Sequence, residues 1–122
     1  ALVPVPLAPV KLRARGYNQA EVLADAVARH WGIPVWRDAL RRTRATPSQT
    51  RLTPGERLAN VHGAFLASAS YAERLRGQHV ILVDDVLTTG ATLNACANAL
   101  FAAGTRTMSY LTFGRARAAA DR

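Results

Sequence analysis

The stretch of the chain that most constrains its fold runs from Val80 to Thr92 and reads V-I-L-V-D-D-V-L-T-T-G-A-T. It opens with four consecutive apolar residues, three of them β-branched, which predicts a strand buried on both faces, as in parallel sheets. Asp84 and Asp85 follow at once, and the residues from Leu93 to Ala103 favour a helix. The predicted order is therefore strand, acidic pair, hydroxyl-rich turn and helix.

The turn between this strand and this helix has the composition of a phosphate-binding site. A glycine among hydroxyl residues at a helix start lets several backbone N–H groups point at one anion, and the helix dipole adds to the attraction. The residues predicted to bind the phosphate are Thr88, Thr89, Gly90, Ala91 and Thr92. The two aspartates can accept hydrogen bonds from ribose hydroxyls or bind Mg²⁺, directly or through water. The alternative is that the acids and threonines only cap the helix.

The combination resembles one known motif and excludes two others. An apolar strand followed by D-D-x-x-T-T-G-x-T resembles the 5-phosphoribosyl 1-diphosphate (PRPP) binding motif of the type I phosphoribosyltransferases. The resemblance implies that Asp84 and Asp85 are catalytic, that Mg²⁺ is the cofactor, and that the threonine turn holds the 5-phosphate of PRPP. No Lys follows Gly90 and no G-x-G-x-x-G occurs, so a Walker A loop and a dinucleotide fingerprint are excluded.

Length, charge and cysteine usage set the broad class. A chain of 122 residues is expected to form one domain, over residues 1–115, with a C-terminal tail over residues 116–122. Because the chain opens on apolar residues without an initiating Met, we expect it to be a piece of a longer protein. No apolar run is long enough to cross a membrane, and the single Cys96 fits a reducing, cytoplasmic compartment. The formal charge of +8 favours an anionic partner, whether diphosphate, nucleotide or nucleic acid.

The segments around the motif predict strands that alternate with helices. Asn18 and Glu21 predict a helix start, and Gly32 ends the helix. Its predicted apolar face consists of Val22, Leu23, Ala26, Val27 and His30/Trp31. The other predicted elements are strands over Leu2–Leu7, Ala39–Thr43, Ala64–Leu66 and Thr105–Phe113, a basic loop over Lys11–Tyr17, and short helices over Thr53–Asn60 and Ser70–Arg76. This order predicts an α/β domain with a mainly parallel sheet flanked by helices.

Two basic segments accompany the motif. Arg13 and Arg15, within R-A-R-G-Y-N-Q, can bind the diphosphate of PRPP, since guanidinium groups bind phosphate oxygens in bidentate fashion. The alternative for these two residues is a solvated basic loop. The arginine-rich segment over residues 41–65 can fold over the site and exclude water, as lids do.

The chain as a whole resembles a narrower group, the ComF family of bacterial competence proteins. The resemblance extends from Val3 to about Arg115 and rests on V-P-L, R-x-R-G-Y-N-Q-A, T-P-x-Q-x-x-L-x-x-x-x-R-x-x-N-V-x-G-A-F and V-D-D-V-L-T-T-G-A-T. It implies a type I phosphoribosyltransferase-like fold, a link to DNA uptake, and a lid or acceptor side formed by Gln49, Arg51 and Arg57. The paired Cys-x-x-Cys motifs of the family's N-terminal zinc finger are absent from this chain.

Two functions of different classes follow. The first is an enzyme that transfers the 5-phosphoribosyl group from PRPP to an unknown acceptor with Mg²⁺ and releases diphosphate. The second is a module without turnover that binds PRPP or single-stranded DNA during transformation. The expected partners are PRPP and the acceptor, with single-stranded DNA and a second copy of the chain as further candidates and no membrane. Fold alone does not choose between the two functions.

Overall fold

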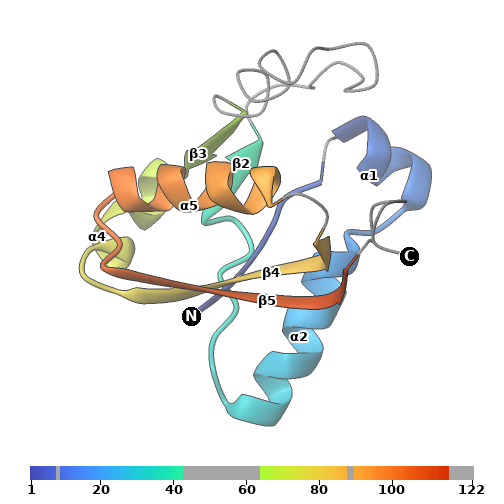
Figure 1. Ribbon diagram of the computed structural model, residues 1–122, viewed down its shortest axis with the longest axis horizontal. Helices are drawn as coiled ribbons and strands as arrows, with labels where there is room; N and C mark the ends of the chain where they lie inside the picture. Colours follow the sequence, from blue (N-terminus) through green and yellow to red (C-terminus); the bar gives the residue numbers. More distant parts are fainter. Residues whose placement is uncertain (8, 43–63, 88–89, 116–122) are drawn as a thin grey trace.

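A three-stranded parallel sheet forms the centre of the domain. The computed structural model describes residues 1–7, 9–42, 64–87 and 90–115. Its middle strand is β4 (His79–Leu87), with β1 (Leu2–Pro4) on one side and β5 (Thr107–Arg115) on the other. Figure 1 shows α5 (Ala91–Ala102) over one face of this sheet and α2 (Gln19–Trp31) over the other. The predicted α/β class with a mainly parallel sheet is confirmed.

The middle strand is buried on both faces, as its apolar run predicts. Val80 and Leu82 belong to the core shared with α5, and Val83 belongs to the core shared with α2. All three side chains are fully buried. On the α5 side the core contains the fully buried Cys96, which packs there as a small apolar side chain.

Helix α2 begins and ends where its sequence predicts. The Asn18 side-chain oxygen accepts a hydrogen bond from the backbone N–H of Ala20 at 3.1 Å, and its amide donates to the carbonyl of Val5 at 3.0 Å. The cap therefore also ties the helix to the end of β1. Gly32 ends the helix with a left-handed φ of 67°, a conformation that glycine adopts at low cost.

The face that α2 turns to the sheet agrees with the prediction only in part. Leu23 and Val27 are partly buried and pack against the core that contains Val83. Val22, Ala26 and Trp31 are exposed, and the fully buried residues are Ala20 and Ala24. Small side chains spaced by four residues lie on one side of a helix and let it approach the sheet closely. The prediction is confirmed for Leu23 and Val27 and wrong for Val22, Ala26 and Trp31, because it placed the centre of the apolar face away from Ala20 and Ala24.

Residues 9–15 form a helix, α1 (Pro9–Arg15), where the sequence analysis predicted a basic loop. Proline suits the first turn of a helix, and the Lys, Leu, Arg and Ala residues that follow are good helix formers. Gly16 ends α1 with a φ of 84°, and its N–H donates to the carbonyl of Leu12 at 2.7 Å. The loop prediction failed because it was based on charge and neglected helix propensity.

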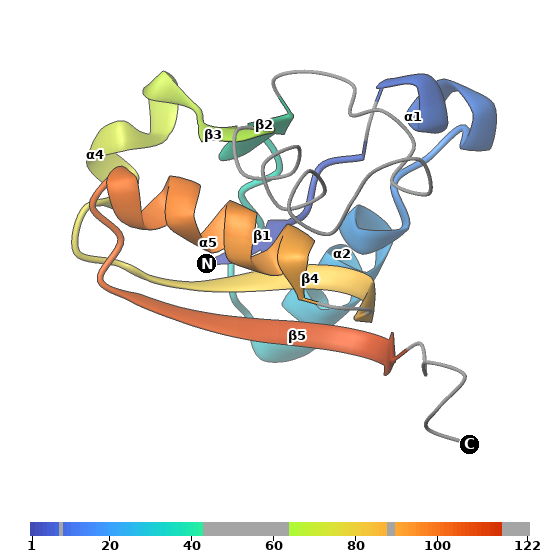
Figure 2. The same cartoon turned by 45° about the horizontal axis from the view of Figure 1, so that its top comes forward.

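A separate small sheet pairs β2 (Leu40–Arg42) with β3 (Phe65–Ala67) in antiparallel fashion. Both strands lie where the sequence predicts strands. Residues of the small sheet join the core shared with α5, and Figure 2 shows the small sheet next to that helix. The predicted short helix over Ser70–Arg76 is present as a 3₁₀ turn, η2 (Ala69–Tyr71), followed by α4 (Ala72–Leu75). None of the described helices is long and apolar enough to cross a membrane.

Candidate functional site

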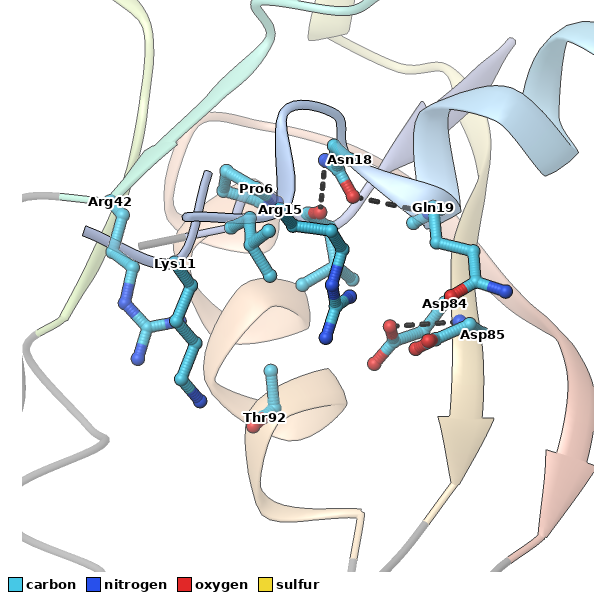
Figure 3. A pocket seen from close by; sticks show the side chains of 12 residues that line it. Pro6, Lys11, Arg15, Asn18, Gln19, Arg42, Asp84, Asp85 and Thr92 are labelled. Atoms are coloured by element: carbon cyan, nitrogen blue, oxygen red, sulfur yellow. Dashed lines mark hydrogen bonds between the residues drawn. The ribbon is translucent and has the colours of Figure 1, made fainter. Parts of the chain in front are cut away.

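A polar cavity lies at the carboxyl end of β4, where ligands bind in parallel α/β sheets. Figure 3 shows side chains from α1, from the start of α2, from β2 and from the first turn of α5 gathered around it. Its polar lining consists of Lys11, Arg15, Asn18, Gln19, Arg42, Asp84, Asp85 and Thr92. The cavity therefore combines carboxylates, cations and a helix start within one space.

Asp84 and Asp85 both line the cavity and are partly buried. The backbone N–H of Asp85 donates to Oδ1 of Asp84 at 2.9 Å, and the N–H of Val86 donates to Oδ1 of Asp85 at 2.9 Å. Burial raises the pKa of Asp84 to about 6, and the adjacent Asp85 carboxyl group contributes to the rise. Both carboxylates are thus anchored by backbone donors and keep oxygens that can accept hydrogen bonds from a ligand.

The predicted phosphate turn is described from Gly90 onward, and Thr88 and Thr89 lie outside the described residues. Gly90 precedes α5 with a φ of 83°, a left-handed conformation that favours glycine. Thr92 lines the cavity on the first turn of the helix. The N-terminus of α5, a helix of 12 residues, therefore adjoins the same cavity as the carboxylates, as the motif predicts.

Lys11, Arg13 and Arg15 of α1 are all exposed, but only two of them line the cavity. Lys11 and Arg15 are four residues apart, which places them on one side of the helix, and both line the cavity. Arg13 is not among the lining residues, because a step of two residues turns a helix by about 200°. The sequence analysis missed Lys11 as a cavity residue. Its spacing from Arg15 was the available signal, and it has meaning only once α1 is known to be a helix.

Arg42 enters the cavity from β2, far along the chain from α1. Its guanidinium lies over the Phe65 ring of β3, 5.0 Å from the ring centre, in a cation–π contact. Burial lowers the pKa of the Arg42 guanidinium and is the main influence on it. The sequence placed this arginine only within the arginine-rich segment over residues 41–65. Gln49, Arg51 and Arg57, predicted for the lid or acceptor side, lie outside the described residues.

The donor set of the cavity suits Mg²⁺ that arrives with a phosphate ligand. The described residues contain no group of three or more His, Cys, Asp or Glu side chains that could hold a metal ion. Two adjacent carboxylates are present, and Mg²⁺ typically binds one or two carboxylates together with phosphate oxygens and water. Asp84 and Asp85 are the residues that would hold the ion, directly or through water.

Comparison with known proteins agrees with this arrangement. Competence protein F of Haemophilus influenzae (strain ATCC 51907 / DSM 11121 / KW20 / Rd) is 36% identical over 116 residues, which cover 95% of this chain and 50% of that protein. DNA utilization protein YhgH of Escherichia coli (strain K12) is 36% identical over 84% of this chain and 44% of that protein. Competence protein ComFC of Bacillus subtilis (strain 168) is 36% identical over 84% of this chain and 39% of that protein.

The chain thus spans about half the length, or less, of these curated relatives. Their likeness to it confirms the resemblance to the ComF family. The family described as "Phosphoribosyl transferase domain" matches residues 17–119, which is most of the sequence. The chain therefore belongs to the phosphoribosyl transferase domain family.

Proposed function

We propose that this chain binds PRPP with Mg²⁺ and transfers the 5-phosphoribosyl group to an acceptor, with release of diphosphate. The observation that carries the proposal is the single cavity in which two carboxylates, the first turn of α5 and two cations of α1 meet. These groups match the three parts of PRPP, which are a ribose, a 5-phosphate and a diphosphate. The names of the relatives, competence protein and DNA utilization protein, support a role for this activity in DNA uptake.

Each group has one task in this proposal. The N-terminus of α5 binds the 5-phosphate through backbone N–H groups and the hydroxyl of Thr92. Asp84 and Asp85 accept hydrogen bonds from the ribose hydroxyls. Lys11 and Arg15 bind the diphosphate and neutralise part of its charge. PRPP is then held at both ends, with its reacting carbon between them.

The reaction breaks the bond between C1 of the ribose and the diphosphate oxygen, and forms a bond between C1 and the acceptor. Negative charge grows on the diphosphate as it leaves, and cations already fixed around it stabilise that charge without reorganisation. Bound Mg²⁺ supplies further positive charge to the leaving group. Lys11 and Arg15 therefore assist departure, and the helix N-terminus keeps the ribose in place.

Calorimetry of PRPP binding in the presence of Mg²⁺ tests the proposal. The double variant Asp84→Asn and Asp85→Asn removes two charged acceptors, each worth about 1.5–3 kcal/mol, so affinity should fall by roughly 100-fold or more. Asp38→Asn, an exposed carboxylate elsewhere, is the matched control. Equal PRPP affinity of the double variant and the native chain would refute the assignment of the carboxylates.

Diphosphate release then separates the enzyme from the binding module. The native chain is incubated with PRPP, Mg²⁺ and a panel of nitrogen nucleophiles, and free diphosphate is measured. Release that depends on one acceptor supports transfer. Tight binding of PRPP without release for any acceptor would favour the module without turnover.

A further inference from the structure

The strand β5 lies at an edge of the parallel sheet and is long for an edge strand. It is nine residues long and pairs with β4, and among the described residues no other strand pairs with it. Figure 2 shows β5 along the outer side of the sheet. Natural proteins protect such edges with charged residues, proline or bulges. Residues 107–114 contain no charged residue and no proline, so this edge is open to pairing.

Aromatic side chains flank the open edge on both faces of the sheet. The register with β4 places Leu111 opposite Val83, on the face covered by α2, and Phe113 follows on that same face. Tyr110 points to the face covered by α5. Phe113 is 53% exposed and Tyr110 is 49% exposed. A strand added at this edge would cover apolar surface on both faces as well as satisfy backbone groups.

We propose that β5 pairs with β5 of a second copy of this chain, in antiparallel fashion about a two-fold axis at Leu111. Such an isologous contact joins the same surface of both copies. Residues opposite each other in an antiparallel pair share a face, so the axis must pass through a residue rather than between two. The axis at Leu111, the middle of the strand, is the one that pairs the whole of β5.

The side chains of β5 complement one another in this register, because each large side chain meets a small one. The opposed pairs are Phe113 with Ser109, Tyr110 with Thr112, Met108 with Gly114, and Thr107 with Arg115. Only Leu111 meets itself, at the axis. The strand is thus self-complementary in shape, and its one charged residue, Arg115, lies at the end and opposes a threonine, which favours a second copy over an unrelated strand.

The net charge of +8 predicts how this dimer responds to salt. Two copies repel each other at long range, while the contact itself contains no charge over residues 107–114. Added salt screens the repulsion and should strengthen the dimer. One strand pair buries less surface than a standard interface, so the dimer should be weak and depend on concentration.

Sedimentation equilibrium of the whole chain, from low micromolar to several hundred micromolar, tests the association. In Tyr110→Lys the two introduced lysines lie diagonally across the axis, with their backbone positions about 7–8 Å apart, and repulsion between their charges should abolish the dimer. Phe101→Lys on α5 replaces an aromatic side chain that is 46% exposed and lies off the edge, and should leave the dimer intact. Circular dichroism confirms that both variants are folded.

Disulfide crosslinking tests the register independently. The two copies of residue 111 lie about 4.5–5.5 Å apart between Cα atoms, within the range of a disulfide, so Leu111→Cys should crosslink under mild oxidation. The two copies of Ser109 on the same face are separated by about 13 Å or more, so Ser109→Cys should not. Cys96 is fully buried and remains in both variants. A chain that stays monomeric at every concentration, a dimer that survives Tyr110→Lys, or crosslinking of Ser109→Cys in preference to Leu111→Cys would overturn the proposal.

Discussion

Replacing Asp84 by Asn should raise the free energy of unfolding at neutral pH, although the same change should weaken PRPP binding. Asp84 is partly buried next to a second carboxyl group, and burial raises its pKa from 3.8 to about 6. Its charged form is therefore unfavourable in the folded chain. Asparagine has the same shape and keeps the oxygen that accepts the hydrogen bond from the N–H of Asp85. The substitution removes the charge and preserves the contact.

The size of the gain follows from the difference in pKa between the folded and unfolded chain. A rise from 3.8 to about 6 corresponds to about 3 kcal/mol at about 1.4 kcal/mol per pKa unit. Asp84 is partly exposed to solvent, which screens its charge, so we expect about 1–2 kcal/mol. For a domain of this size such a gain raises Tm by roughly 3–8 °C.

The pH dependence gives the prediction its sign. Because the folded pKa lies above the unfolded value, the stability that this carboxyl group contributes is fully present below pH 3.8 and is lost as the pH rises through about 6. The advantage of Asp84→Asn should therefore be complete above about pH 6 and fall to less than half at about pH 4.5.

Urea denaturation at about pH 7.5 and about pH 4.5, without PRPP and Mg²⁺, measures the gain in the free energy of unfolding and its dependence on pH. Asp38→Asn removes the charge of an exposed carboxylate and should change little. An unchanged free energy of unfolding for Asp84→Asn at neutral pH, or a gain that is the same at both pH values, would refute the argument from burial. A variant that is more stable but binds PRPP less well would show that Asp84 lowers the stability of the chain and is needed for binding.

Three further substitutions test other parts of the site. Lys11→Ala should lower PRPP affinity by roughly 10- to 100-fold in calorimetry, since a charge-assisted contact is worth about 1.5–3 kcal/mol. Arg13→Ala, outside the cavity lining, should change the affinity little. Equal losses for the two variants would contradict the assignment of Lys11, and not Arg13, to the cavity. Gly90→Ala should cost about 1–2 kcal/mol in chemical denaturation because its φ is 83°. Gly114→Ala, where φ is not positive, should cost less, and equal costs would exclude backbone strain. Asn18→Ala should lower stability by about 1–2 kcal/mol through the loss of two hydrogen bonds, and an unchanged Tm would show that the cap contributes nothing.

The elements that sequence predicts correctly are those with strong local signals. The apolar run of β4, the Asn18 cap and the Gly32 stop each act within a few residues of themselves, and the structure places all three as predicted. Helix α1 carries a proline and several charges, which are features of loops as well as of helix starts. The high helix propensity of its Lys, Leu, Arg and Ala residues explains why the segment is a helix.

The site itself is only half predictable, because its parts come from distant segments. Asp84 and Gly90 belong to one motif and can be recognised together. Lys11 joins them only through the orientation of α1, and Arg42 only through the placement of the small sheet. Arg42 has no spacing or neighbour in the sequence that relates it to the motif, and the spacing of Lys11 from Arg15 has meaning only once α1 is known to be a helix. Their role in the cavity depends on tertiary packing, which a local pattern does not encode.

The contact between Arg42 and Phe65 couples the cavity to local opening of the small sheet. Its two strands have only three residues each, and we expect so short a ladder to open at a free energy below that of global unfolding, although Leu40 and Phe65 are buried in the core. If Arg42 leaves the cavity when the small sheet opens, affinity for an anion depends on the fraction of time that the small sheet is closed. Anion binding and closure of the small sheet are linked equilibria, so an anion bound by Arg42 should in turn favour the closed sheet. Amide hydrogen exchange in β2 and β3 should then slow when the cavity fills.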